Sequence, residues 1–133
     1  MVYCFDLDLN RLKPIDIPSI EFRITDATKA DANNRFWVIN NFWEGEEKKL
    51  SPAQDNFIPN IFSKRENGIK RLLHLELRDG EIKITDKKTL MLAYEGWNWE
   101  GLVLLDDLGF LIINDEYSPM PERTNLAFIP LLK

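Results

Sequence analysis

The chain has 133 residues, the length of one modest domain, and its 44% hydrophobic and 11% aromatic content can build a core, which excludes disorder as a description of the whole chain. Its formal net charge of -5 argues against binding to nucleic acid, whose phosphates are held by an excess of Lys and Arg. One cysteine, Cys4, and one histidine, His74, cannot supply the four ligands of a structural zinc site.

The amino-terminal segment carries acids where a secretory signal has basic residues followed by an apolar run, so we expect no export signal there. No stretch approaches the roughly eighteen apolar residues of a transmembrane helix, and we expect no membrane span. The pattern Asp6-x-Asp8-x-Asn10 matches the start of an EF-hand calcium loop, but the later glycine and glutamate of that loop are absent. Alternation of apolar and polar residues explains the pattern better.

Apolar side chains recur with a period of two, which is typical of half-buried strands. The alternation covers residues 3–9 and again residues 73–77, and Asp79-Gly80 then predicts a tight hairpin turn before a strand over residues 81–85. We predict an all-β fold of about nine strands, with His74 on an exposed polar face. No G-x-S-x-G turn is present, so a serine-hydrolase triad around this histidine has no support.

Two further runs, Arg35–Asn40 and Phe110–Asn114, are short, β-branched or aromatic, and bounded by Asn, Asp and Gly, which predicts buried strands. Residues 43–70 carry many charges, prolines and glycines and are typical of a long excursion between two strands. Such a loop is either a lid or binding loop, or a solvated insertion.

The two buried runs are copies of one another. A shift of 74 residues without gaps places Phe36 on Phe110 and Asn40 on Asn114, and it also places Asp26 on Glu100. A shift of 70 residues lays residues 3–7 on residues 73–77, so a hairpin repeats as well. Without most of the insertion the period is roughly 50 residues, within the range of the four-stranded blades of β-propellers.

We therefore predict a single partial β-propeller of four-stranded antiparallel blades, with strands A to D numbered from the axis outward. Residues 1–18 are assigned to strands C and D of one blade, and residues 19–88 to a complete blade that contains the insertion 43–70. Residues 89–133 are assigned to an incomplete last blade. The chain then amounts to about two blades of a six-bladed ring.

The units EFRITDATKADANNRFWVINNFW and NWEGLVLLDDLGFLIINDEY, followed by TNLAFIPL, resemble the carboxyl-terminal blades of the phytase-like (esterase-like activity of phytase) β-propeller family. The resemblance covers most of the chain apart from the insertion. It implies a six-bladed ring, calcium in a polar axial site, and hydrolysis of a phosphoester or an ester, in a family that is often exported. With about two of six blades present, we expect the isolated chain to be inactive, and the catalytic residues stay unknown.

In such a ring the start of strand A and the end of strand B meet near the axis. Carboxylate and amide oxygens gather there, and these are the ligands that calcium prefers. The alternative is that the two A-strand acids accept hydrogen bonds from backbone N–H groups of neighbouring A strands. The predicted metal ligands are Glu100, Asp26, Asn40, Asn114 and Asp115.

A ligand site is predicted at the same end of the blades. Trp97 and Trp99 could stack on a ring-shaped ligand, or they could be wedged between blades. A phosphate needs basic residues, which two arginines and Lys29 supply. The predicted ligand-binding residues are Asn98, Trp99, Arg23 and Arg35.

Two classes of function remain open on the sequence: a calcium-dependent hydrolase, and a non-catalytic propeller scaffold that binds a small molecule or a protein. In either case the cut ends of a partial ring leave apolar faces and strand edges without partners. We expect the chain to self-associate or to pack against the missing blades.

Overall fold

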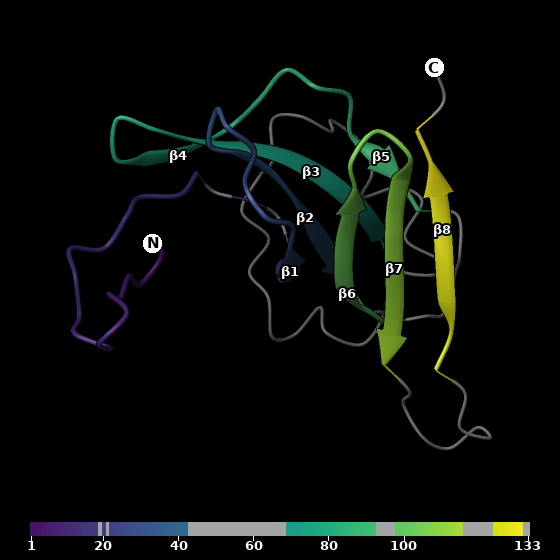
Figure 1. Cartoon of the computed structure of the whole chain (residues 1–133), viewed down its shortest axis with the longest axis horizontal. Helices are drawn as coiled ribbons and strands as arrows, with labels where there is room; N and C mark the ends of the chain where they lie inside the picture. The colour runs from purple at the N-terminus through teal and green to yellow at the C-terminus, as the bar shows by residue number, and fades with distance from the viewer. Residues whose placement is uncertain (19, 21, 43–68, 93–97, 116–123, 132–133) are drawn as a thin grey trace.

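The computed structural model describes residues 1–18, 20, 22–42, 69–92, 98–115 and 124–131, which contain two antiparallel β-sheets (Figure 1). These residues contain no α-helix, and hence none that is long and apolar enough to cross a membrane. The prediction of an all-β chain is confirmed for the described part. The strands are β1 (Arg23–Ala27), β2 (Arg35–Phe42), β3 (Ile69–Arg78), β4 (Glu81–Ile84), β5 (Leu90–Met91), β6 (Asn98–Leu105), β7 (Gly109–Asp115) and β8 (Leu126–Pro130).

The first sheet has the order β1-β2-β3-β4, and β5 also pairs with β3. Strand β3 is ten residues long, so β4 pairs with its carboxyl-terminal part and β5 with Arg71 and Leu72 near its start. Strands β4 and β5 therefore act as one outer strand that is interrupted at residues 85–89. The predicted hairpin turn is confirmed, because Asp79 and Gly80 both have positive φ, as a tight β-hairpin requires.

The second sheet has the order β6-β7-β8, and neither sheet closes on itself. Alternate side chains of a strand point to opposite sides, so each sheet has two faces. One face of the first sheet packs against one face of the second. The core between them is formed by Trp37, Ile39, Leu72, Trp99, Leu102, Phe110 and Ile112. The other face of the first sheet holds a second cluster around Val38, Leu73 and Leu75, so the central strand β2 is buried on both sides.

Strands β2 and β7 are the second strands of their sheets, and they occupy equivalent positions, as the 74-residue repeat predicts. Asn40 pairs with Ile24 at one end of the ladder between β1 and β2, and Asn114 pairs with Trp99 in the ladder between β6 and β7. In both sheets the ladder slips by one residue immediately after this pair, at a β-bulge in the first strand.

Between β1 and β6, which are the first strands of their sheets, the 74-residue repeat is out of register by one residue. After the bulge the next paired residues are Asp26 in β1 and Gly101 in β6, so the counterpart of Glu100 is Thr25 and not Asp26. The stretch from Ile24 to its partner Asn40 is one residue longer than the stretch from Trp99 to its partner Asn114, and a gap-free comparison cannot register this difference. The predicted equivalence of the two acids is wrong.

The amino-terminal segment does not form the strands predicted for residues 1–18. It folds back on itself through isolated bridges, Val2 with Ile15 and Phe5 with Arg11, and it touches β4 through a parallel bridge from Asp16 to Glu81. Alternation alone does not make a sheet strand here, because no neighbouring strand pairs along its length. The predicted insertion falls almost wholly outside the described residues, and β3 already begins at Ile69.

Candidate functional site

The structure brings together several of the predicted site residues where β1 begins and β2 ends. Asn98, the first residue of β6, accepts hydrogen bonds on its Oδ1 from Arg23 Nη2 at 2.7 Å and from Asn41 Nδ2 at 2.8 Å. Asn40 is fully buried and donates to the Arg23 carbonyl at 3.1 Å. It also accepts a hydrogen bond from Arg71 Nε at 2.6 Å. This polar cluster links the two sheets at one end.

The side chains of β1 replace a backbone ladder along the edge of β6. Asp26 Oδ2 accepts the backbone N–H of Leu102 at 2.6 Å, and Thr25 Oγ1 donates to the carbonyl of Trp99 at 2.7 Å. The Asp26 carboxylate therefore plays the structural role that the sequence left open as an alternative to metal binding. Glu100 is exposed and accepts a hydrogen bond from the side-chain amide of Asn98.

The remaining predicted metal ligands lie at the end of β7. Asn114 Oδ1 accepts the backbone N–H of Asn125 at 2.5 Å, which ties β7 to the segment that enters β8. Asp115 is the last residue of β7 and pairs with Asn98, while its side chain lies outside the described part.

These oxygens do not fit a calcium site. Asp26, Asn40 and Asn114 each direct a side-chain oxygen at a protein N–H group, and the guanidinium of Arg71 lies against Asn40. A cation would have to displace these donors and sit beside a positive charge. Within the described residues no three His, Cys, Asp or Glu side chains come together as metal ligands. Calcium binding stays a prediction.

Trp99 is not available to a ligand. Its side chain is fully buried in the core between the sheets, which corresponds to the wedged position that the sequence left open. Trp97 lies outside the described residues. Of the four predicted ligand residues, Asn98 and Arg23 join the sheets, and Arg35 alone lines an open cleft.

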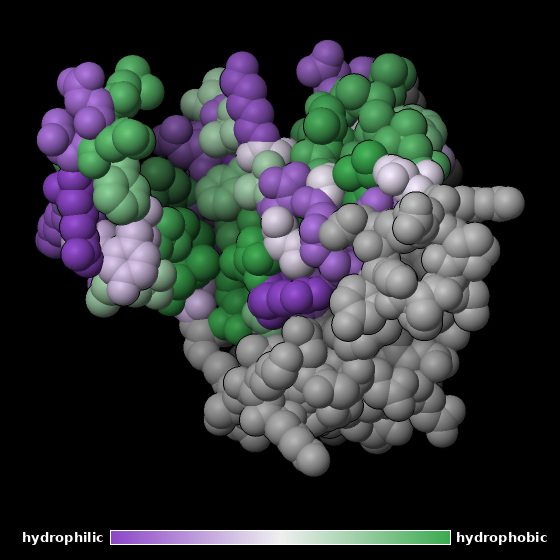
Figure 2. All heavy atoms as spheres, turned by 90° about the horizontal axis from the view of Figure 1, so that it is seen from below, coloured by the Kyte–Doolittle hydropathy of each residue, from purple (hydrophilic) through white to green (hydrophobic). Residues whose placement is uncertain are grey.

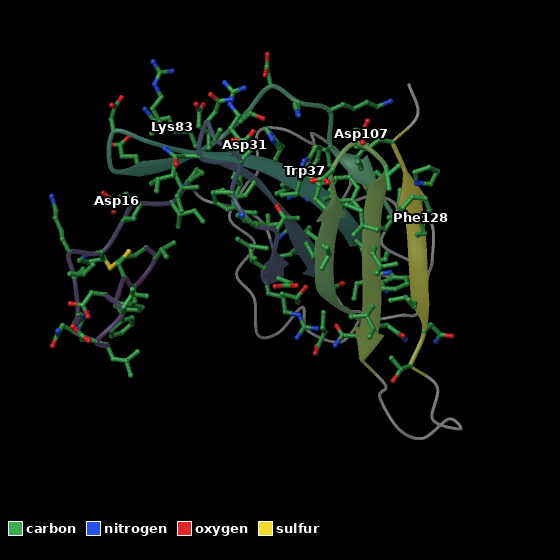
Figure 3. The ribbon with its side chains drawn as sticks, in the orientation of Figure 1. Asp16, Asp31, Trp37, Lys83, Asp107 and Phe128 are labelled. Atoms are coloured by element: carbon green, nitrogen blue, oxygen red, sulfur yellow. The ribbon has the colours of Figure 1, made fainter. Side chains whose placement is uncertain are left out.

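This cleft, of about 670 Å³, lies between the sheets at the other end of β1. Strand β1 is five residues long, so the cleft is roughly 13 Å from the polar cluster. Figure 3 shows Trp37 between the sheets and Asp31 in the loop beside the same end. The loop 28–34, β2, β3, the break in the outer strand and the end of β6 all contribute to it. The lining residues are Thr28, Lys29, Ala30, Asp31, Ala32, Arg35, Trp37, His74, Lys87, Leu102, Val103, Leu104 and Asp106.

His74 forms the floor of this cleft, and the prediction of an exposed strand histidine is wrong. Its side chain is 4% exposed and lies against Trp37, on the same face of β3 as the core residue Leu72. Its Nδ1 lies 2.7 Å from Thr85 Oγ1, and its ring centroid lies 4.7 Å from that of Trp37. Burial lowers the pKa of His74, and the nearby positive charges of Lys87 and Arg35 lower it further. These influences favour the neutral imidazole over the charged form.

Three cationic side chains surround the opening. Lys87, from the break between β4 and β5, lies over the Trp37 ring with its Nζ 5.6 Å from the centroid. Arg35 is 44% exposed and forms only a loose ion pair, 3.6 Å from Glu76. Lys29 comes from the loop that follows β1. Because the three come from different segments, they converge on one space only in the folded chain.

Asp31 shapes the loop that carries Lys29. Its Oδ1 accepts the backbone N–H groups of Asn33 at 2.8 Å and Arg35 at 2.9 Å, and these bonds, with that to Arg35 the stronger influence, lower the pKa of its carboxyl group. The Asp-x-Asn-Asn sequence at residues 31–34 was a visible signal for such a turn. Sequence reasoning missed the cleft because its walls are distant in the chain.

No protein-family model matches the chain, and neither does any curated protein or solved structure.

Proposed function

We propose that the chain is a non-catalytic binding module, built from two propeller-type blades, whose cleft takes a small organic anion with an apolar group. The meander order of both sheets, the equivalent positions of Asn40 and Asn114, and the face-to-face packing support the blade architecture. The first sheet and the second sheet then correspond to two successive blades of a larger ring.

The observation that carries the proposed ligand is the convergence of charge and apolar surface in the cleft. Lys29, Arg35 and Lys87 provide donors for an oxyanion, and hydrogen bonds to a charged partner are the stronger kind. The wall formed by Trp37 and Leu104 suits an apolar group that carries the anion. Asp31 and Asp106 also line the cleft and oppose an anion, so the ligand has to lie on the side of the three cations.

A phosphate monoester with a chromogenic leaving group, 4-nitrophenyl phosphate, tests binding and hydrolysis together. We expect saturable shifts in the amide NMR spectrum at residues 28–35 and at Lys87, without release of nitrophenolate. Arg35→Ala and Lys87→Ala should each weaken binding about tenfold, because each removes a charge-assisted contact. Lys88→Ala is the matched control, since Lys88 is exposed and lies outside the cleft.

The same titration decides between the two classes of function. Release of nitrophenolate that needs added calcium and disappears in Glu100→Gln would support the hydrolase that the family resemblance implies. Equal affinity in the Arg35 and Lys88 variants would show that the cleft does not bind the anion. Parallel titration with 4-nitrobenzoate distinguishes a phosphate from a carboxylate as the preferred group.

A further inference from the structure

Within the described part of the chain, one face of the second sheet packs on the first sheet and the other face packs on no other sheet. Its covered side packs on the first sheet, whereas Leu105, Ile113, Leu126 and Phe128 on the opposite side are between 37% and 63% exposed. We call these four residues the open face. In Figure 2 apolar side chains gather on the side of the molecule where Figure 1 places β7 and β8. Ile113 and Leu126 pair directly across β7 and β8, and Phe128 follows two residues later on the same face of β8. Exposed apolar patches are typical of interaction sites in proteins.

The internal repeat shows what such a face contacts elsewhere in the same chain. The 74-residue shift places Ile39 of β2 on Ile113 of β7. Ile39 is fully buried because the second sheet covers it, while Ile113 is 40% exposed. The face that is covered by an apolar β-surface in the first sheet is therefore uncovered in the second.

A second uncovered apolar surface lies at the amino terminus. Residues 1–15 form a folded-back segment, which we call the N-terminal hairpin, and its exposed apolar side chains include Tyr3, Phe5, Leu7 and Leu9, at 56% to 103% exposure. The hairpin is held in shape by Asp6, which accepts hydrogen bonds from the backbone N–H groups of Asp8 and Asn10. The Arg11 guanidinium lies over the Tyr3 ring, 5.0 Å from its centroid, and all four side chains remain more than half exposed.

The N-terminal hairpin cannot cover the open face of its own chain. Its end is fixed to β4, where the N–H of Ile82 donates to the Asp16 carbonyl at 2.8 Å. Figure 1 places this end of the molecule far from β8, and Figure 3 shows Asp16 and Phe128 on opposite sides. A contact between the two surfaces therefore needs two molecules.

We propose that the chain associates head to tail, with the N-terminal hairpin of one copy packed on the open face of a second copy. Leu7 lies at the turn of the N-terminal hairpin, where Leu9 N–H donates to the Asp6 carbonyl, so the hairpin presents its most exposed apolar side chain at its tip. One head-to-tail contact covers one surface of each kind, whereas pairing two open faces would leave both hairpins exposed. This contact is heterologous and is separate from the anion proposed for the cleft.

Two variants of the full chain test the contact. The face variant, Leu126→Lys with Phe128→Lys, and the hairpin variant, Phe5→Lys with Leu7→Lys, change only exposed side chains. Both introduce positive charge, so the altered surfaces cannot form ion pairs with each other. Met91→Lys is the control, because Met91 is 54% exposed and belongs to neither surface. Circular dichroism and urea unfolding check that each variant folds as the wild type does.

Sedimentation equilibrium at micromolar concentrations gives the readout. We expect the wild type and Met91→Lys to associate, and each double variant alone to dissociate at least about tenfold more readily. An equimolar mixture of the two double variants should form only one-to-one heterodimers, because the pair retains one intact hairpin and one intact open face. A monomeric wild type overturns the proposal, as does a mixture that stays monomeric. Persistent dimers of the hairpin variant would show face-to-face pairing instead and overturn it equally.

Discussion

Removal of the Asp26 carboxylate should weaken the junction between the two sheets. The carboxylate accepts the Leu102 N–H at 2.6 Å, and this N–H lies on the edge of β6 that pairs with no other strand among the described residues. A hydrogen bond to a charged group contributes about 1.5–3 kcal/mol, and its loss leaves a half-buried donor unsatisfied. We therefore expect Asp26→Ala to lower the free energy of unfolding by about 2 kcal/mol. Asp26→Asn, which keeps an acceptor oxygen, should cost roughly half as much.

Urea unfolding followed by tryptophan fluorescence measures this effect, because Trp99 is fully buried between the sheets and becomes exposed when they separate. Thr25→Val is the companion variant, since it removes the hydroxyl that donates to the Trp99 carbonyl and should cost about 1 kcal/mol. If Asp26→Ala unfolds as the wild type does, the carboxylate does not hold the sheets. If calcium stabilises the wild type and fails to stabilise Asp26→Asn, the metal-ligand role is correct after all.

Two further changes test the cleft floor and the bulge. Because burial holds the pKa of His74 below its ordinary value of 6.5, the unfolded chain binds the proton more readily, and the free energy of unfolding should fall as the pH drops below about 6.5. In urea unfolding from pH 5 to 8, His74→Gln should reduce the pH dependence of the free energy of unfolding. An unchanged pH dependence would show that another group causes it. Gly101→Ala should destabilise by at least about 1 kcal/mol, because the added Cβ would overlap Ile113 Cγ2. Gly80 has open space around an added Cβ but a positive φ of 78°, so Gly80→Ala measures backbone strain without steric overlap. Equal losses of unfolding free energy in the two variants would contradict the overlap at Gly101.

Local pattern predicted the central strands and the hairpin turn, because both depend on neighbouring residues. The runs at Arg35–Asn40 and Phe110–Asn114 lie within β2 and β7, and Asp79-Gly80 forms the turn between β3 and β4. The same alternation failed at residues 3–9. A period of two indicates which side chains could share a face, but it does not provide a neighbouring strand, and that neighbour is what makes an extended segment a strand.

The candidate site was only partly predictable, for reasons that lie in tertiary structure. Asn98 and Arg23, both predicted as ligand-binding residues, lie where strands start and are hydrogen-bonded to each other. Their chemistry was not predictable, because only the packing of the sheets shows that their polar groups satisfy each other. His74 reads as exposed on an alternating strand, but it is buried against Trp37 on the face of β3 that also carries the core residue Leu72. Lys87 enters the cleft through a break in an outer strand that no local signal located.

Both sheets have a bulge in their first strand, but the residue that follows it differs, and this residue determines how each sheet can bond to a neighbouring sheet. In β1 the residue after the bulge is Asp26, whose side chain bonds the next sheet, and in β6 the corresponding residue is Gly101, which has no side chain and no room for one. Whatever covers the open face therefore cannot be tied by the same carboxylate and must rely largely on apolar contact. Association there should weaken on cooling, respond little to sodium chloride, and strengthen in sulfate, whereas the junction inside the chain keeps its directional bonds under all three conditions.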